Sequence, residues 1–459
     1  MEDAQTKKIT LFIATLAAFI GPFDASAVNV ALPAMGKEFA MNAVSLGWVA
    51  TAYLLSSAIF LLPFGRLADI FGRKKIYTTG LFVFTVASLT MTTVNAEIML
   101  IILRVIQGIG AALIYGTGMA LLTSVFPLQE RGKALGIVVS STYIGLSAGP
   151  FLGGLLTHNF GWRSIFLVNV PIGFSVILLI LFKLKGEWAE AKGEKMDLTG
   201  SILYCIGLTA VIYGFSSFSS LSTSLSLGII LAGIVSVSIF AWWENRSKNP
   251  ILEINLFRKN RTFGFSNLAA LINYCATFAI TFFLSLYLQY IKQLDAQTAG
   301  AILMAQPIIM AVSSPFAGRL SDRIEPRIVA SLGMGLTAVG LFLLAFLHAG
   351  TYISFIIAVL IVIGLGFGLF SSPNSNAVMS SVEKKYYGVA SGTLATMRIT
   401  GQMFSMGIAM LIFAIHMGNA QITPANFPAF MASTKTAFIL FGLFCTGGIF
   451  ASLARGTLR

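Results

Sequence analysis

The feature that most constrains this chain is a long succession of apolar stretches, each interrupted by a cluster of charged residues, proline or asparagine. Each stretch is near the ~20 residues that an α-helix needs to cross the hydrocarbon core of a bilayer. The 459 residues leave only short connections between the stretches and no room for a second, water-soluble domain. We therefore predict an all-α polytopic protein of the cell membrane. The fourteen candidate spans are 9–35, 44–64, 77–95, 98–125, 134–156, 164–184, 198–216, 225–243, 263–290, 297–317, 328–348, 351–372, 388–414 and 433–454.

The distribution of charge predicts the orientation of these spans. The chain has 30 Lys and Arg against 17 Asp and Glu, a formal net charge of +13. An even number of spans places both termini on one side, where the tails and loops hold 24 basic residues. Basic residues concentrate in cytoplasmic loops, so both termini are predicted to be cytoplasmic. The basic surplus thus reflects topology, and we expect no nucleic-acid partner. The opposite side has four basic residues, Lys37, Arg163, Lys292 and Lys435.

Several other function classes are disfavoured. Cys205, Cys275 and Cys445 are far apart within apolar runs, a pattern that supports neither a disulfide framework nor a zinc site. The sequence has no GxxxxGK[ST] phosphate-binding loop, which excludes an ATP-driven pump. We expect no metal, no cofactor and no enzymatic activity.

An internal repeat indicates two related halves. Residues 63–69 read Pro-Phe-Gly-Arg-Leu-Ala-Asp, and residues 315–322 read Pro-Phe-Ala-Gly-Arg-Leu-Ser-Asp. Many transporters consist of repeated halves with the substrate site between them. We predict an N-terminal six-helix bundle (1–185), a linker with two inserted transmembrane helices (186–262) and a C-terminal six-helix bundle (263–459). The insert is expected to be a peripheral hairpin, and 186–197 a solvated linker.

The loop at 65–75, Gly-Arg-Leu-Ala-Asp-Ile-Phe-Gly-Arg-Lys-Lys, resembles the cytoplasmic loop signature of the major facilitator superfamily. Glycine permits a tight turn between helices, and an acid followed by basic residues can pair at a helix end. The resemblance implies the major facilitator fold and a cytoplasmic gate in which Asp69 pairs with Arg73 and Arg131. The second copy has Glu325 and Pro326 in place of the glycine and arginine, so its gate should be weaker or built differently. The predicted gate residues are Gly65, Asp69, Gly72, Arg73, Arg131 and Asp322.

Two charged residues inside spans are candidates for proton coupling. Asp24 is the one acid of the seventeen that falls within a span, and a carboxylate there can alternate between protonated and charged forms as its access to water changes. Arg104 lies in a stretch, 103–112, that resembles the superfamily's membrane-embedded arginine motif, which implies a role in tuning a carboxylate. The alternatives are a hydrogen-bonded structural Asp24 and an Arg104 whose head group reaches the outer interface.

A third motif suggests the direction of transport. Gly145, Gly149 and Gly153 recur every four residues and form one smooth stripe for close helix packing, while Pro150 removes a backbone hydrogen bond. Together with Gly154, they resemble the motif of the superfamily's antiporters, which are mostly drug exporters. Stretches 24–33, 48–53 and 161–171 extend the resemblance, over essentially the whole chain, to the fourteen-helix drug:proton antiporter family. The resemblance implies proton-driven multidrug efflux by two rocking units.

The substrate cavity is expected to be apolar and aromatic. Spans 10 and 13 contain no acid, which favours monovalent lipophilic cations, zwitterions or neutral compounds over dications. Arg398, in span 13, is either an interior arginine bonded to carbonyls or a counter-charge for an anion, so export of an organic anion or lipid metabolite is an alternative. A non-transporting sensor or scaffold is a further alternative. We expect a monomer in the bilayer, with small lipophilic substrates and protons as partners. The cavity candidates are Phe23, Tyr53, Tyr143, Asn273, Tyr274, Phe278, Gln306, Arg398 and Gln402.

Overall fold

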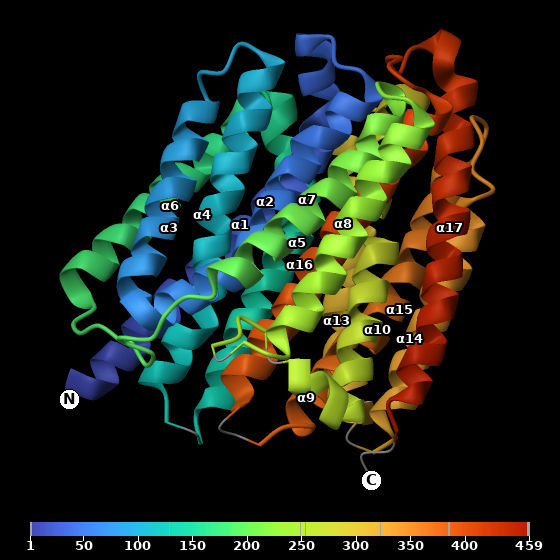
Figure 1. The fold of residues 1–459 in the computed structure, drawn as a ribbon. Coiled ribbons are helices and arrows are strands. Elements are labelled where there is room, and N and C mark those ends of the chain that lie inside the picture. Colours follow the sequence, from blue (N-terminus) through green and yellow to red (C-terminus); the bar gives the residue numbers. More distant parts are fainter. Residues whose placement is uncertain are drawn as a thin grey trace.

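The computed structural model describes residues 2–127, 129–247, 249–252, 254–321, 323–383 and 386–456, and every long element in them is a helix (Figure 1). Both termini lie at the same end of the bundle, as the even number of predicted spans requires. The helices are α1 (Glu2–Phe39), α2 (Ala43–Phe71), α3 (Arg73–Met91), α4 (Glu97–Val125), α5 (Arg131–Phe160), α6 (Arg163–Lys183), α7 (Leu198–Ser216), α8 (Thr223–Glu244), α9 (Ile254–Lys259), α10 (Arg261–Thr277), α11 (Ala279–Leu286), α12 (Ala296–Leu303), α13 (Ala305–Ser321), α14 (Pro326–Leu344), α15 (Ile353–Ser380), α16 (Tyr387–His416) and α17 (Phe427–Ala454).

The predicted membrane fold is confirmed, with one difference in how the spans are counted. In the described part of the chain, thirteen helical segments are long and apolar enough to cross a membrane. The predicted span at 77–95 corresponds to α3, which is not among the thirteen. This helix begins with three basic residues, Arg73, Lys74 and Lys75, and its remaining apolar part is short. It nevertheless lies beside α4 and α6 within the bundle, as the other members of the first half do (Figure 1).

Two of the predicted spans are interrupted helices. Span 9 consists of α10, α11 and a π-helical turn, Tyr287–Ile291, and span 10 consists of α12 and α13, with a break at Met304. Pro307 explains the second break, because it has no N–H to donate to the carbonyl of Leu303. Interrupted helices expose backbone polar groups that are tolerated where they are buried in protein or border a cavity.

The helices pack as two groups with a hairpin at their side. In the first group α1 packs on α5 and α6, and α2 on α4; in the second, α14 packs on α15 and α17, and α10 on α16. The hairpin of α7 and α8 contacts both groups through α7, which lies against α2 and α16. Cys205 of α7 donates to the carbonyl of Ile59 at 3.2 Å, the carbonyl that Pro63 leaves without a helical donor. The exact domain boundaries stay a prediction.

The two groups touch at the outer ends of their helices. Gly154 of α5 and Gly300 of α12 have backbone atoms of the facing helix so close that a Cβ at either position would overlap them. The loop after α16 also reaches the first group, because Ala43 N donates to the carbonyl of Ala420 at 3.2 Å and Gln421 Nε2 to the carbonyl of Ala40 at 2.6 Å. The outer side is therefore closed in this structure.

Candidate functional site

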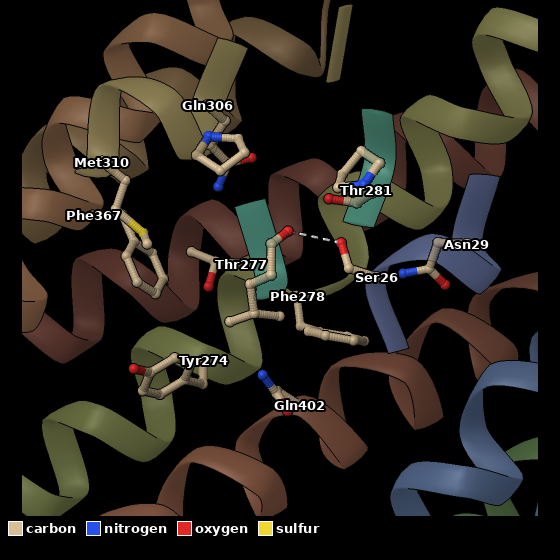
Figure 2. A pocket seen from close by; sticks show the side chains of 13 residues that line it. Ser26, Asn29, Tyr274, Thr277, Phe278, Thr281, Gln306, Met310, Phe367 and Gln402 are labelled. Carbon is tan, nitrogen blue, oxygen red and sulfur yellow. Dashed lines mark hydrogen bonds between the residues drawn. The ribbon is translucent and has the colours of Figure 1, made fainter. Parts of the chain in front are cut away.

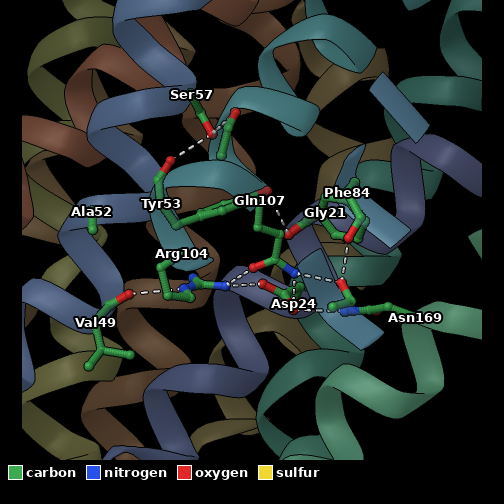
Figure 3. Close-up of polar contacts among 12 residues, drawn as sticks. Gly21, Asp24, Val49, Ala52, Tyr53, Ser57, Phe84, Arg104, Gln107 and Asn169 are labelled. Carbon is green, nitrogen blue, oxygen red and sulfur yellow. Dashed lines mark hydrogen bonds and ion pairs between the residues drawn. The ribbon is translucent and has the colours of Figure 1, made fainter. Parts of the chain in front are cut away.

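The two predicted coupling residues form a buried ion pair. Arg104 Nη1 of α4 lies 2.5 Å from Asp24 Oδ2 of α1, and the side chains are 1% and 0% exposed (Figure 3). The guanidinium lies over the ring of Tyr53, 4.4 Å from its centroid. Arg104 therefore faces the protein interior, and the alternative in which it reaches the membrane interface is wrong.

Neutral partners also bind Asp24 Oδ1 and the Nε and Nη1 atoms of Arg104. Gln107 Nε2 and Asn169 Nδ2 donate to Asp24 Oδ1 at 3.1 and 2.8 Å. Arg104 Nε donates to the carbonyl of Val49 at 2.9 Å, and its Nη1 also donates to Gln107 Oε1 at 2.5 Å. Sequence reasoning missed Gln107 and Asn169. The available signal was their amide side chains within spans, where a polar group requires a partner.

The glycine stripe joins α5 to the helix that carries Asp24. A Cβ at Gly149 would lie 2.5 Å from Cβ of Ser26, and a Cβ at Gly153 would lie 2.7 Å from Cα of Ala27. A Cβ at Gly145 would likewise lie 2.5 Å from the carbonyl oxygen of Phe19. The backbone of α1 therefore approaches α5 as closely as the four-residue spacing of glycines predicts.

The hydrogen bond that Pro150 removes from α5 is replaced by α1. Pro150 cannot donate to the carbonyl of Leu146, and Ser26 Oγ donates to that carbonyl instead at 3.0 Å. Ser26 is two residues from Asp24, so the bend in α5 and the coupling pair share one segment of α1. Gly154 does not belong to this contact, because it packs on α12.

A central cavity lies where α1 and α5 face α10, α13, α15 and α16 (Figure 2). It has a volume of about 80 Å³ and continues into a second, smaller space, with which it shares Leu146 and Gln402. Six predicted cavity residues line these two spaces, namely Tyr53, Tyr274, Phe278, Gln306, Arg398 and Gln402. Further lining residues that sequence reasoning missed are Ser26, Asn29, Tyr115, Thr277, Thr281, Met310 and Phe367.

Three predicted cavity residues do not line it. Phe23 stacks on Phe19 with ring centroids 5.5 Å apart, and Asn273 is fully buried, with neither amide atom bonded. Each is one residue from a position that faces the cavity, and a step of one residue turns a helical side chain by about 100°. Tyr143 instead bridges the two groups, since its hydroxyl lies 3.0 Å from that of Tyr274 and 2.5 Å from Ser371 Oγ.

Arg398 lines the second, smaller space and provides the single charge in the lining of the two spaces within the described residues. It is partly buried near mid-membrane, and in the described part of the chain no ion pair or hydrogen bond engages its guanidinium. The interpretation of Arg398 as an arginine bonded to carbonyls is therefore not supported by the geometry. Asp24 is absent from the same lining, although its neighbours Gly21 and Ala25 belong to it.

A larger cavity, of about 400 Å³, opens at the cytoplasmic ends of the helices. Asp69 lies beside it and pairs with Arg73 at 2.7 Å, as predicted. Arg131 lines the same cavity, but within the described contacts it donates to the carbonyl of Phe126 at 2.9 Å and does not pair with Asp69. Tyr115 borders both this cavity and the space around Arg398. Asp322, the predicted gate acid of the second repeat, lies outside the described residues.

The linker after α6 is largely exposed, as predicted, but two of its acids also contact the gate loop and the start of α3. Glu190 accepts two hydrogen bonds from Arg73, at 2.7 and 3.0 Å. Glu187 accepts from the backbone N–H groups of Lys74 and Lys75 at the start of α3. A carboxylate is favoured there by the unpaired N–H groups and the helix dipole. Both acids are exposed, as expected, but their contacts with the gate loop were not predicted, because these contacts depend on the path of the chain in space.

The glycines of the gate loop have distinct roles. Gly72 has φ of 114°, a backbone conformation that side chains disfavour, and it ends α2 and begins α3. Gly65 lies against Gly116 of α4, where an added Cβ would be 3.4 Å from the facing carbonyl oxygen. The short turn at Gly72 places Asp69 and Arg73 on adjoining helix ends.

The fold, the repeated gate loop and the membrane-embedded ion pair define a membrane transporter of two helical groups with a cavity between them. The chain belongs to the Major Facilitator Superfamily, whose family model matches residues 14–406 and also residues 266–458. The major facilitator fold expected from the gate loop is thereby confirmed.

Known proteins similar to the chain include transporters of different substrates. It is 30% identical over 445 residues to the riboflavin transporter RibZ of Clostridioides difficile (strain 630), with 96% of each chain covered. It is 31% identical over 419 residues to the multidrug resistance protein Stp of Mycobacterium tuberculosis (strain CDC 1551 / Oshkosh), covering 89% of this chain and 75% of Stp. In fold, it resembles the crystal structure of a bacterial homolog of the human lysosomal transporter Spinster, with a TM-score of 0.67, 15% identity and coverage of 98% and 97%.

Proposed function

We propose that this protein is a proton-coupled exporter of lipophilic small molecules, of the fourteen-helix drug:proton antiporter type, and that its substrates are neutral or anionic. The observation that carries the charge preference is the lining of the central cavity and of the smaller space into which it continues, whose described residues include Arg398 and no carboxylate. A cation in this cavity would face an unpaired guanidinium at low dielectric, which is unfavourable. The cationic substrates first considered are therefore the less favoured class.

Export from the cytoplasm is supported by two observations. The outer ends of α5 and α12 are in contact, whereas the cytoplasmic cavity of about 400 Å³ reaches Tyr115, which also borders the space around Arg398. The glycine and proline motif of α5 resembles that of exporters, and the relative Stp is a multidrug resistance protein. A substrate would enter from the cytoplasm in this conformation and leave after the two groups rock.

Proton coupling is assigned to the ion pair of Asp24 and Arg104. In the unprotonated state the carboxylate holds Arg104 and the amides of Gln107 and Asn169. A proton arriving from outside would neutralise Asp24 and release Arg104, and its loss to the cytoplasm would re-form the pair. Because α1 packs on α5 through Ser26 and the glycine stripe, a change at Asp24 acts on a helix that lines the central cavity.

The proposed substrates include organic anions, for which Arg398 would be the counter-charge. The absence of any described partner for this guanidinium favours it over the structural role. A non-transporting sensor is less favoured, because the Asp69–Arg73 pair and the Asp24–Arg104 pair are both formed.

Transport in proteoliposomes tests the proposal. Purified protein is reconstituted with an imposed proton gradient and offered fluorescent dyes of similar size that are anionic, neutral or cationic. We expect gradient-driven transport of the anionic and neutral dyes. Arg398→Gln should lower transport of the anionic dye about tenfold, equivalent to ~1.4 kcal/mol, while leaving the neutral dye nearly unchanged. Asp24→Asn should abolish the dependence on the gradient.

Two results would contradict the proposal. Transport restricted to the cationic dye would overturn the charge preference. Substrate-driven proton movement of normal size in Asp24→Asn would overturn the coupling assignment, whatever the substrate proves to be.

A further inference from the structure

A cavity of about 510 Å³ lies on the flank of the second helical group, between α9, the first turns of α10, and α16. None of its lining residues lines the central cavity or the cytoplasmic cavity. Its wall is apolar, formed by Phe265, Leu268, Leu271 and Met397. Phe257, Gly264 and two arginines, Arg258 and Arg261, complete the lining.

The position of this cavity matches one leaflet of a bilayer. Arg258 and Arg261 are exposed and lie at the cytoplasmic end, where α10 begins. Leu268 and Leu271 follow along α10, about 10 and 15 Å deeper at 1.5 Å per residue, and half of a ~30 Å hydrocarbon core is about 15 Å. Leu268 is 41% exposed, so the cavity opens toward the surrounding membrane.

The corner between α9 and α10 is held in place by polar contacts. Asn260 caps α10 by accepting from Phe263 N at 2.9 Å, and its Nδ2 donates to the carbonyl of Ser381 at 2.5 Å. Arg261 Nε donates to the carbonyl of Ala454 at 2.7 Å, which leaves its terminal nitrogens available. No ion pair engages Arg258 in the part of the chain that the structure describes. The Arg261 guanidinium is thus held in place, and no described ion pair neutralises either arginine.

We infer that this cavity binds an anionic phospholipid of the cytoplasmic leaflet, with the phosphate between Arg258 and Arg261 and an acyl chain along the apolar wall. Charge complementarity favours this occupant, because guanidinium groups bind phosphate oxygens in a bidentate manner and the cytoplasmic leaflet carries the anionic lipids. An apolar transport substrate could fill the wall but would leave both positive charges at the rim without a counter-charge.

Lipid titration of the full-length protein in detergent tests this inference, with bound lipid counted by native mass spectrometry. Phosphatidylglycerol and phosphatidylcholine with identical acyl chains serve as probes. We expect phosphatidylglycerol to bind on the order of tenfold more tightly. Arg258→Gln should remove about half of this preference on a logarithmic scale, and Arg258→Gln combined with Arg261→Gln should remove nearly all of it.

A neighbouring lysine provides the matched control. Lys259 is exposed on the same short helix but does not line the cavity, so Lys259→Gln removes the same charge and should change the lipid preference less than twofold. Leu271→Trp should fill the wall and weaken both lipids equally. Thermal unfolding of each variant verifies its fold, and if the double variant unfolds, the single Arg258→Gln variant still decides the question.

Three outcomes would overturn the inference. They are equal affinity for the two lipids, an effect of Lys259→Gln as large as that of Arg258→Gln, and displacement of phosphatidylglycerol by a neutral transport substrate. Binding of soluble glycerol phosphate, which has no acyl chain, as tight as that of phosphatidylglycerol would likewise assign the site to free phosphate. The transport proposal does not depend on this result, since Arg398 and the central cavity are not altered in these variants.

Discussion

Arg104 and Arg398 are both arginines within membrane spans, but their surroundings differ completely. Arg104 is 1% exposed and bonded to Asp24, Gln107 and the carbonyl of Val49. Arg398 borders the central cavity and has no hydrogen bond or ion pair within the described residues. In the first case the protein itself meets the cost of burying a charge, and in the second that cost is left for a ligand to offset. The comparison separates a charge that maintains the fold from one that is available for binding.

The largest effect is expected when the satisfied pair is broken. Arg104→Gln leaves the carboxylate of Asp24 buried without its counter-charge, so we expect a loss of about 3–5 kcal/mol of stability. Thermal unfolding in detergent measures it. The double variant Asp24→Asn with Arg104→Gln removes both charges and should recover most of the loss. Equal stability of Arg104→Gln and the wild type would show that the pair is not structural.

A much smaller change in stability is expected at the unpaired arginine. Arg398→Gln removes no bond present in the described structure, so its stability should stay within about 0.5 kcal/mol of the wild type even though binding of an anion falls. The same unfolding assay, with and without an anionic substrate, measures both effects. Stabilisation by the substrate should be present in the wild type and reduced in the variant. If Arg398→Gln lost as much stability as Arg104→Gln, the proposed difference between the two arginines would be wrong.

A small effect on stability is also expected at an exposed pair, which serves as a reference for the influence of burial. His158 Nδ1 and Asp295 Oδ1 lie 3.8 Å apart at the outer ends of α5 and α12, and both side chains are nearly half exposed. The pKa of Asp295 is lowered, first by the backbone N–H of Thr298 and also by His158. Its stabilisation is therefore present above the ordinary value of 3.8 and is lost as the pH falls through the lower folded-state pKa.

Asp295→Asn tests this calibration, because asparagine can still accept the capping bond from Thr298. Unfolding measured between pH 3 and pH 7 should show a loss below about 1 kcal/mol near neutral pH that disappears at the acidic end. A loss that grows as the pH falls, or one comparable to that of Arg104→Gln, would contradict the dependence on burial.

The sequence alone predicted the helices well and the contacts between them unevenly. Runs of apolar residues define spans because burial in lipid is a local property of composition, and the glycine stripe of α5 predicted its close approach to α1. The partners of Asp24 on other helices depend on rotation about each helix axis, which a sequence pattern does not determine. Tyr274 and its neighbour Asn273 were both predicted to line the cavity. For the same reason, the prediction is right for Tyr274 and wrong for Asn273, which is buried away from the cavity.

The gate loop illustrates a second limit of sequence reasoning. The acids of 186–197 have the composition of a solvated segment, and only the three-dimensional path of the chain brings Glu187 and Glu190 to α3. Arg131 shows the opposite error. It was expected to pair with Asp69 because it lies near the gate, but it donates to the carbonyl of Phe126 instead. Long-range ion pairs of this kind depend on tertiary geometry, to which residue type contributes little.

The contact of Gly154 and Gly300 at the outer closure has a consequence for energetics. Because neither residue has a side chain, the backbones of α5 and α12 approach each other closely at this point. At these two glycines, parting the helices exposes no side chain of either residue, and at about 25 cal/mol per Å² the small area involved corresponds to a small free energy. These two glycines therefore contribute little apolar surface to the outer closure, which is also held by the contacts of Ala420 and Gln421 with the first group.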